Sequence, residues 1–191
     1  MKNGACLLDV KALVAGYKDP VVGPVSFRLS RGEILGLSGP NGSGKSTVLR
    51  ALIGRARIFS GSVERCEGVR AEVQPQQPVR LAEMPITGRE FLSLTGADRQ
   101  PPPAQLAPLL DERLDRLSGG QFQLLHVWAC LGSPADLVLL DEPDNNMDPK
   151  ARATLIEVLH GSRREGRGVL VVSHEHDLID AVCTRLVEVA P

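Results

Sequence analysis

The sequence predicts an α/β fold in which a mostly parallel β-sheet is flanked by helices, and two observations carry this prediction. After residue 117, short apolar runs of strand length alternate with segments of helical periodicity, the order typical of a parallel sheet covered by helices. Residues 34–54 add a strand, a glycine-rich turn and a helix in direct succession. We expect one domain over residues 1–191, with a mostly β N-terminal part and a small helical subdomain inserted at about residues 77–135.

The bulk composition is that of an ordinary globular domain. Its 191 residues are 42% hydrophobic and 24% charged, and the formal net charge is −1. This balance gives no whole-chain electrostatic reason to bind nucleic acid or an anionic membrane. No apolar run approaches the roughly 18 residues of a membrane span, and the N-terminus lacks the apolar core of a signal peptide. If the protein works at a membrane, another chain would therefore have to supply the membrane part. The four cysteines are scattered, so we expect reduced thiols in a cytosolic protein.

Strand-like segments fill the first part of the chain. Residues 5–14 have strand character, and residues 25–29 alternate apolar and polar side chains as a half-buried strand does. Two further short strand-like runs lie near residues 62–66 and 69–73. We therefore expect the N-terminal part to be mostly β.

A glycine-rich loop at residues 39–47 fits the pattern G-x-x-x-x-G-K-[ST] and lies between an apolar strand and helical spacing. Glycine adopts backbone conformations closed to other residues, so successive N–H groups can turn inward around an anion. The N-terminus of the following helix points at the same place. Lys45 can then reach the β- and γ-phosphates of a nucleotide, and Ser46 can ligate Mg²⁺. The loop predicts nucleotide binding; the alternative is a glycine-rich turn that happens to precede a lysine.

The middle of the chain is rich in proline. Residues 74–78 are expected to form a loop, because proline cannot donate to a strand ladder. Helical segments are expected near residues 87–94 and 105–110. The apolar positions of the first of these helices are Phe91, Leu92 and Leu94.

Helices and buried strands alternate from residue 117 onward. The helices are expected at residues 122–131, 149–165 and 177–183, and the strands at residues 137–140, 168–173 and 186–189. The first of these strands runs directly into Asp141 and Glu142. A carboxylate at the carboxyl end of a parallel strand stands where open α/β sheets bind ligands. Asp141 would hold Mg²⁺, directly or through water, and Glu142 would orient or deprotonate the attacking water, although such an aspartate on its own could be a helix N-cap.

Four motifs together resemble the nucleotide-binding domain of the ABC ATPase superfamily. They are residues 39–47, the pentapeptide Leu-Ser-Gly-Gly-Gln at 117–121, residues 137–142 and Ser-His at 173–174. The pentapeptide is that superfamily's own signature, and the resemblance covers nearly the whole chain in the expected order. It implies a fold of the P-loop NTPase type with an N-terminal antiparallel β subdomain, and it implies ATP and Mg²⁺ as ligands.

The resemblance also implies roles for single residues around the nucleotide. Tyr17 resembles the aromatic residue that stacks on adenine, although it could be an ordinary core or surface tyrosine. His174 resembles the switch histidine that contacts the γ-phosphate, and residues 145–148 occupy the position of the D-loop.

One glutamine is expected to sense Mg²⁺ and the attacking water. Gln76 resembles that residue because Pro75-Gln76 matches the family's usual Pro-Gln pair, but Gln74 and Gln77 are close competitors.

The pentapeptide implies a dimer. In this family its residues bind the γ-phosphate of an ATP molecule held by the opposite subunit, again through a helix N-terminus. One chain carries one glycine loop and one pentapeptide, so two chains facing head to tail would complete two sites, as a homo- or heterodimer that ATP holds together. The predicted catalytic residues are Glu142, His174 and Gln76, and the predicted Mg²⁺ ligands are Ser46, Gln76 and Asp141. The predicted nucleotide-binding residues are Tyr17, Gly39, Pro40, Asn41, Gly42, Ser43, Gly44, Lys45, Ser46, Thr47, Ser118, Gly119, Gly120, Gln121 and Asp141.

Three positions depart from the family pattern. Leu124 stands where an arginine is common, Trp128 where a small residue is usual, and Asp144 replaces the commoner threonine. None of the predicted catalytic groups is missing, so we expect a chain that hydrolyses ATP.

Three functions fit this resemblance. The favoured one is the ATP-binding subunit of a transporter, peripheral on the cytoplasmic, inner face of a membrane and driving separate integral membrane subunits that dock near Gln76 and the helical insert. A soluble ATPase of the ribosome is the alternative, although such proteins usually carry two such domains in one chain. A nucleotide-gated scaffold without turnover is the third, and the presence of Glu142 and His174 argues against it. The favoured function requires no direct contact with nucleic acid.

Overall fold

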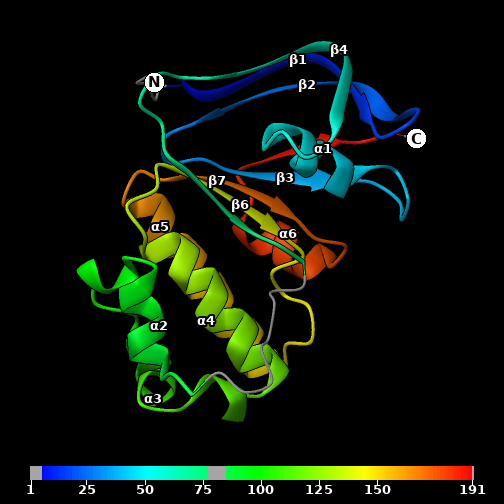
Figure 1. Ribbon diagram of the computed structural model, residues 1–191. Coiled ribbons are helices and arrows are strands. Elements are labelled where there is room, and N and C mark those ends of the chain that lie inside the picture. The colour runs from blue at the N-terminus through cyan, green and yellow to red at the C-terminus, as the bar shows by residue number, and fades with distance from the viewer. Residues whose placement is uncertain (1–5, 77–84, 191) are drawn as a thin grey trace.

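The computed structural model describes residues 6–76 and 85–190, which form two β-sheets with helices packed around them (Figure 1). A three-stranded antiparallel sheet has the order β2-β1-β4, and a five-stranded parallel sheet has the order β5-β6-β7-β3-β8. The predicted α/β fold, with an antiparallel β subdomain near the N-terminus, is confirmed.

The elements have the following bounds. The strands are β1 (Cys6–Gly16), β2 (Pro20–Ser30), β3 (Ile34–Ser38), β4 (Arg57–Arg65), β5 (Ala71–Gln74), β6 (Leu137–Asp141), β7 (Gly168–Val172) and β8 (Arg185–Glu188). The helices are α1 (Lys45–Leu52), α2 (Gly88–Leu94), α3 (Ala107–Leu110), α4 (Gly119–Gly132), α5 (Pro149–Arg164) and α6 (His176–Val182). Single 3₁₀ turns are η1 (Ala97–Arg99), η2 (Ala104–Leu106) and η3 (Leu114–Arg116).

The parallel sheet lies between two apolar layers. Successive side chains of a strand point to opposite faces, so Val138 and Val171 pack with helices α4, α5 and α6 on one face. Leu139 and Leu170 pack on the other face with α1 and the antiparallel sheet. Because both faces are covered, strands β3, β6 and β7 are continuous apolar runs, which is why their positions follow from the sequence.

The segment between β5 and β6 contributes helices α2, α3 and α4, which lie together below the sheet in Figure 1. Helix α2 begins at Gly88 because Thr87 caps it: its hydroxyl accepts from the Glu90 N–H, and the Glu90 carboxylate accepts from the Thr87 N–H. Leu92 is buried, whereas Leu94, another of the apolar positions of this helix, is 77% exposed. The helix has only seven residues, too few for apolar spacing alone to fix which side of its last turn is buried.

These helices share one apolar core with the parallel sheet. Leu106 and Leu114, from the insert, belong to the same buried cluster as Val138 of β6. The predicted limits of the helical subdomain, residues 77 and 135, stay a prediction, and residue 77 lies outside the described residues.

Two strand predictions need correction. The run expected at residues 62–66 is part of the longer β4, which pairs along β1 from Leu8↔Arg65 to Gly16↔Arg57. β4 is an edge strand with few buried side chains, so its first half carries no apolar pattern to predict it from. Strand β5 begins at Ala71 and includes Gln74, which we had placed in a loop; the ladder ends just before Pro75.

Among the described residues, no helix is both long and apolar enough to cross a bilayer. All four cysteines are free thiols. Burial raises the pKa of the Cys130 and Cys183 thiols to about 12, so both are poor nucleophiles at neutral pH.

Candidate nucleotide-binding and hydrolysis site

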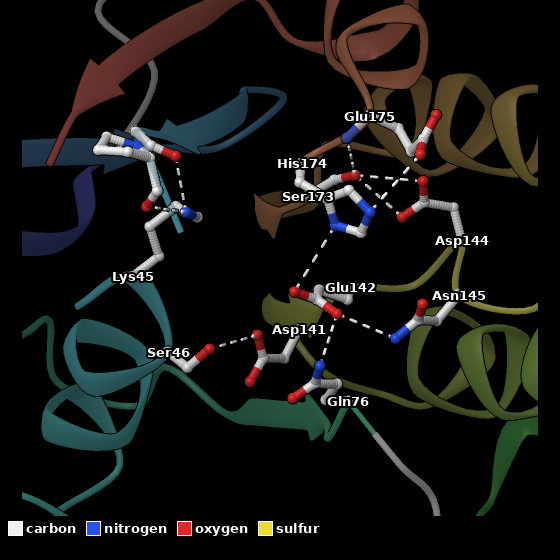
Figure 2. Close-up of polar contacts among 12 residues, drawn as sticks. Lys45, Ser46, Gln76, Asp141, Glu142, Asp144, Asn145, Ser173, His174 and Glu175 are labelled. Atoms are coloured by element: carbon white, nitrogen blue, oxygen red, sulfur yellow. Dashed lines mark hydrogen bonds and ion pairs between the residues drawn. The ribbon is translucent and has the colours of Figure 1, made fainter. Parts of the chain in front are cut away.

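The glycine loop, the two predicted carboxylates and the predicted histidine lie where parallel strands end. Strand β3 leads into the glycine loop, β6 ends at Asp141 next to Glu142, and β7 is followed by Ser173 and His174. Because β6, β7 and β3 are neighbours in the sheet, these groups lie along one edge, as Figure 2 shows. This edge is where open α/β sheets bind ligands.

Backbone conformation explains the glycines of the loop. Gly39, Gly42 and Gly44 have φ angles of 144°, 82° and 94°, which favour glycine. A Cβ on Gly44 would also lie 2.6 Å from the Val22 Cβ, so no larger residue fits without a shift. Gly44 is the N-cap of α1, and the loop therefore leads straight into the positive end of an eight-residue helix.

Lys45, the first residue of α1, turns back over the loop. Its side chain is largely buried, and Nζ donates hydrogen bonds to the carbonyl oxygens of Gly39 (2.8 Å) and Pro40 (3.0 Å). The Lys45 ammonium group is thereby held against carbonyl oxygens of the glycine loop (Figure 2). A depression of about 310 Å³ lies beside it, and the residues that line it are Val21, Asn41, Gly42, Gly44, Lys45, Ser46, Thr47 and Glu142.

Ser46 and Asp141 form a pair of oxygen ligands. The Ser46 hydroxyl donates to Asp141 Oδ1 over 3.1 Å, although the two residues are 95 positions apart. Burial raises the pKa of the Asp141 carboxyl group, and the neighbouring Glu142 charge adds to that rise. A hydroxyl beside a carboxylate at a buried strand end fits Mg²⁺, which prefers hard oxygen ligands.

Glu142 is held from several sides. Its carboxylate Oε2 accepts hydrogen bonds from Gln76 Nε2 (2.6 Å) and Asn145 Nδ2 (2.9 Å), and its N–H donates to the Val172 carbonyl (2.8 Å). The backbone carbonyl of Glu142 accepts from Gln123 Nε2 over 3.2 Å. The φ angle of Glu142 is 49°, a left-handed conformation that is costly for a non-glycine residue and that clusters at functional sites.

His174 lies across from this carboxylate. Its Nδ1 is 3.7 Å from Glu142 Oε1, and its Nε2 is 3.5 Å from Glu175 Oε1. About half of the imidazole is exposed, so its ring faces the open side of the site. The second carboxylate oxygen of Glu142 therefore points toward His174 and away from Gln76 (Figure 2).

The structure separates the competing glutamines. Gln74 is fully buried in β5, whereas Gln76 reaches Glu142; Gln77 lies outside the described residues. The geometry thus favours Gln76, whose role stays a prediction.

Tyr17 lies at the end of β1 with 47% of its surface exposed, so it is no core residue. Its hydroxyl accepts a hydrogen bond from Arg50 Nη1 over 2.6 Å, which ties the ring to the last turn of α1. The exposed ring is free to stack on a base, and its role also stays a prediction.

The pentapeptide lies at the N-terminus of α4. Ser118 caps this helix: its Oγ accepts from the Gln121 N–H (3.2 Å) and its N–H donates to Gln121 Oε1 (2.9 Å). Ser118 and Gly119 are exposed, whereas Gly120 packs against Asn146 and Met147. Within the described residues, no hydrogen bond joins residues 118–121 to the loop at 39–47. The structure therefore does not bring these two predicted phosphate contacts together in one chain.

Sequence reasoning missed several contacts. It gave Asn145 a position in the D-loop but no bond to Glu142, and it assigned no role to Gln123 or Ser173. Asn145 bonds back across a turn, Gln123 reaches Glu142 from helix α4, and Ser173 bonds to a residue that follows the neighbouring strand. Only Asp144, an unusual residue for the family, carried a signal in the sequence.

A glycine loop between a parallel strand and a helix, faced by carboxylates at the next strand ends, defines a P-loop nucleoside triphosphatase domain. The sequence profile described as ABC transporter matches residues 22–145. The chain is 41% identical over 167 residues to the zinc import ATP-binding protein ZnuC of Paracoccus denitrificans, covering 82% of this chain and 64% of that protein. It is 35% identical over 189 residues to ZnuC of Roseobacter denitrificans, covering 95% and 74%.

Among solved structures, the archaeal ribosome recycling factor aABCE1, solved with ribosomal stalk protein aP1, matches 98% of this chain with a TM-score of 0.81 and 27% identity. That match covers only 37% of the larger protein. The chain belongs to the ABC transporter family. The predicted function, the ATP-binding and ATP-hydrolysing subunit of an ABC transporter, is confirmed at the level of the family.

Proposed function

We propose that this chain hydrolyses ATP in a head-to-tail dimer and thereby drives integral membrane subunits from the inner face of the membrane. The observation that carries the proposal is the arrangement around Glu142, whose carboxylate is held by Gln76 and Asn145 beside the Ser46–Asp141 pair. A purely structural carboxylate would not need a left-handed backbone and an open side facing a histidine.

The substrate triphosphate would lie in the glycine loop. The loop N–H groups and the N-terminus of α1 supply hydrogen bonds to phosphate oxygens, and Lys45 would exchange its carbonyl partners for them. Ser46 and Asp141 would hold Mg²⁺, with Gln76 close to them, and the bound ion would neutralise charge on the phosphate oxygens.

Glu142 would act as the general base. Oε2 is occupied by two amide donors, which fix the carboxylate plane, and Oε1 faces His174 across 3.7 Å. A water bound between Oε1 and the terminal phosphate would lose its proton to Glu142. His174 would donate a hydrogen bond to the γ-phosphate and so fix the direction of attack.

The second half of each site would come from the partner. The cap of α4 leaves Ser118 and Gly119 exposed. N–H groups at the start of a 14-residue helix bind anions well, so an ATP molecule between two chains would join them. Hydrolysis removes the γ-phosphate contact that favoured the closed dimer.

A groove beside Gln76 suits a membrane subunit. It has a volume of about 490 Å³ and lies between β5 and helices α2 and α4. Its rim includes Pro75 and the exposed Leu94, and its wall includes Phe91 and Ala129. A helix that binds in this groove would touch the segment next to Gln76, so its movement would reach Glu142 directly.

The ribosomal alternative is tested by what co-purifies. The likeness to the recycling factor spans one part of a much larger protein, whereas ZnuC relatives match over most of their length. Purification of the tagged chain in gentle detergent should recover a polytopic membrane protein. Recovery of ribosomal RNA in its place would support the alternative and contradict the transporter.

The transported substrate is proposed from the relatives alone. Their names refer to zinc import, so we propose a transition-metal cation as the substrate of the complete transporter. Cells that lack this chain should take up less ⁶⁵Zn²⁺ at low external zinc, and the parental gene should restore uptake. Unchanged zinc uptake would contradict this assignment without affecting the ATPase.

A further inference from the structure

A buried carboxylate joins the two turns that carry Glu142 and His174. Asp144 is 3% exposed and Ser173 is 4% exposed, and the Ser173 hydroxyl lies 3.0 Å from Asp144 Oδ1 and 3.2 Å from Oδ2. The two residues are 29 positions apart and follow the neighbouring strands β6 and β7 (Figure 2). Such a bond fixes the separation of the two strand ends.

The Ser173 hydroxyl both donates and accepts a hydrogen bond. It donates to Asp144 and accepts from the Glu175 N–H over 3.0 Å. Glu175 is the N-cap of α6 and forms an ion pair with Arg152 of α5 at 3.5 Å. The residues on both sides of His174, Ser173 and Glu175, are therefore each fixed by hydrogen bonds or an ion pair.

Burying the Asp144 carboxylate costs desolvation free energy. Burial raises the pKa of the Asp144 carboxyl group, while the Ser173 hydroxyl and the Arg152 charge oppose that rise. A carboxylate accepts on either oxygen and gives a stronger hydrogen bond than a neutral group does. This acceptor explains why the chain carries Asp144 where a threonine is commoner in its family.

We propose that Asp144 and Ser173 are a positioning pair that keeps His174 in register with Glu142 for hydrolysis. The inference rests on the proposed roles of those two residues. In the part of the chain that the structure describes, no hydrogen bond joins Asp144 or Ser173 to the glycine loop, so their loss should change turnover and leave nucleotide binding intact. Misplacing a reacting group by about 1 Å can lower a rate by up to roughly a hundredfold.

The test compares Ser173→Ala, Ser173→Thr, Asp144→Asn and the double variant Ser173→Ala/Asp144→Asn in the full chain. Ser173→Ala should lower kcat roughly ten- to hundredfold with KM for MgATP within about twofold. Ser173→Thr keeps the hydroxyl and should recover most of kcat. The double variant should lose no more than the worse single variant, because both changes remove the same bond.

Ser162→Ala is the matched control. Ser162 is also buried, at 3% exposure, and donates to the Leu159 carbonyl within α5, away from the site. This variant should keep the parental kcat. Without nucleotide, the ¹⁵N signals of the His174 ring should shift in Ser173→Ala and not in Ser162→Ala.

Several outcomes would overturn the inference: parental kcat in Ser173→Ala, losses that add in the double variant, or an equal loss in Ser162→Ala. Glu142→Gln separates this failure from failure of the proposed function. If Glu142→Gln is inactive while Ser173→Ala turns over normally, only the positioning pair is wrong. If Glu142→Gln itself turns over normally, the proposed function is wrong.

Discussion

The Gln76 side chain donates a hydrogen bond from Nε2 to Oε2 of Glu142 over 2.6 Å, across 66 residues of chain. Strands β5 and β6 are neighbours in the parallel sheet, so a residue just past the end of one lies beside a residue just past the end of the other. The same segment borders the groove proposed for the membrane subunit. This bond gives a direct physical link between docking and the proposed base.

Gln76→Ala should lower kcat by about tenfold, because Glu142 loses a charge-assisted hydrogen bond of about 1.5–3 kcal/mol that fixes its carboxylate. ATP affinity should stay within about twofold, since no hydrogen bond joins Gln76 to the glycine loop among the described residues. Steady-state phosphate release and a fluorescent-nucleotide titration measure the two quantities. Gln105→Ala removes a similar amide-to-carboxylate bond, to Glu157, far from the site and should change neither. Loss of ATP binding in Gln76→Ala would contradict the assignment.

Lys45→Ala should weaken nucleotide binding itself. The variant loses the ammonium group that Lys45 holds over the loop, so Kd for ATP should rise roughly ten- to hundredfold. Isothermal titration calorimetry of the purified chain measures this change. Lys11→Ala removes a lysine from the exposed side of β1, where it pairs with Glu64, and should leave Kd unchanged. Equal affinity in the parental chain and in Lys45→Ala would mean that the triphosphate lies elsewhere.

Ser118→Arg should spare ATP binding by the monomer and prevent dimer formation. A large side chain at the exposed cap of α4 would occupy the place of the partner's γ-phosphate. Because the substitution also removes an N-cap worth about 1 kcal/mol, Thr87→Arg is the control, since it removes the equivalent cap of α2. Sedimentation velocity with ATP, in a Glu142→Gln background that slows turnover, should show dimer for the control alone. A dimer in Ser118→Arg would count against the contact in trans.

The free energy of unfolding should decrease as the pH is lowered, because of His126. Its ring lies 4.6 Å from that of Phe91 and 4.5 Å from that of Phe122, and burial lowers the pKa of His126 to about 4. Between pH 6.5 and 4 the unfolded chain binds a proton at this residue that the folded chain does not. The contribution of His126 is therefore complete above about pH 6.5 and decreases by on the order of 2 kcal/mol toward pH 4.

Urea unfolding at pH 7, 5 and 4 tests the role of this histidine. His126→Phe keeps an aromatic ring that does not titrate, so the variant should lose less stability than the parental chain as the pH falls. Identical pH dependence of the two proteins would show that His126 is not the group responsible.

Local patterns predicted the parts of the site that are local in sequence. The glycine loop and the strand ending at Asp141 each depend on a few adjacent residues, because tight turns and buried strands restrict residue type at fixed positions. The resemblance to the ABC ATPase superfamily then implied that these motifs belong to one nucleotide site.

Contacts between distant segments could not be predicted in this way. The Gln76–Glu142 and Asp144–Ser173 bonds depend on which strands are neighbours. The strand order β5-β6-β7-β3-β8 cannot be predicted from the sequence of any single strand. The left-handed backbone of Glu142 could not be predicted either, since a glutamate residue does not require this conformation. The exposure of Leu94 could not be predicted either, because a helix of seven residues is too short for its apolar spacing to fix its buried side.

Phosphate release by Glu142→Gln is the most direct test of the account. The amide keeps the shape and the contacts of the side chain but cannot take a proton, so turnover should fall at least roughly a hundredfold. Binding of ATP should stay at the parental level, and the dimer should accumulate with ATP bound. If Glu142→Gln releases phosphate at the parental rate, alone or with its membrane subunits, Glu142 is not the base and the proposed mechanism is wrong.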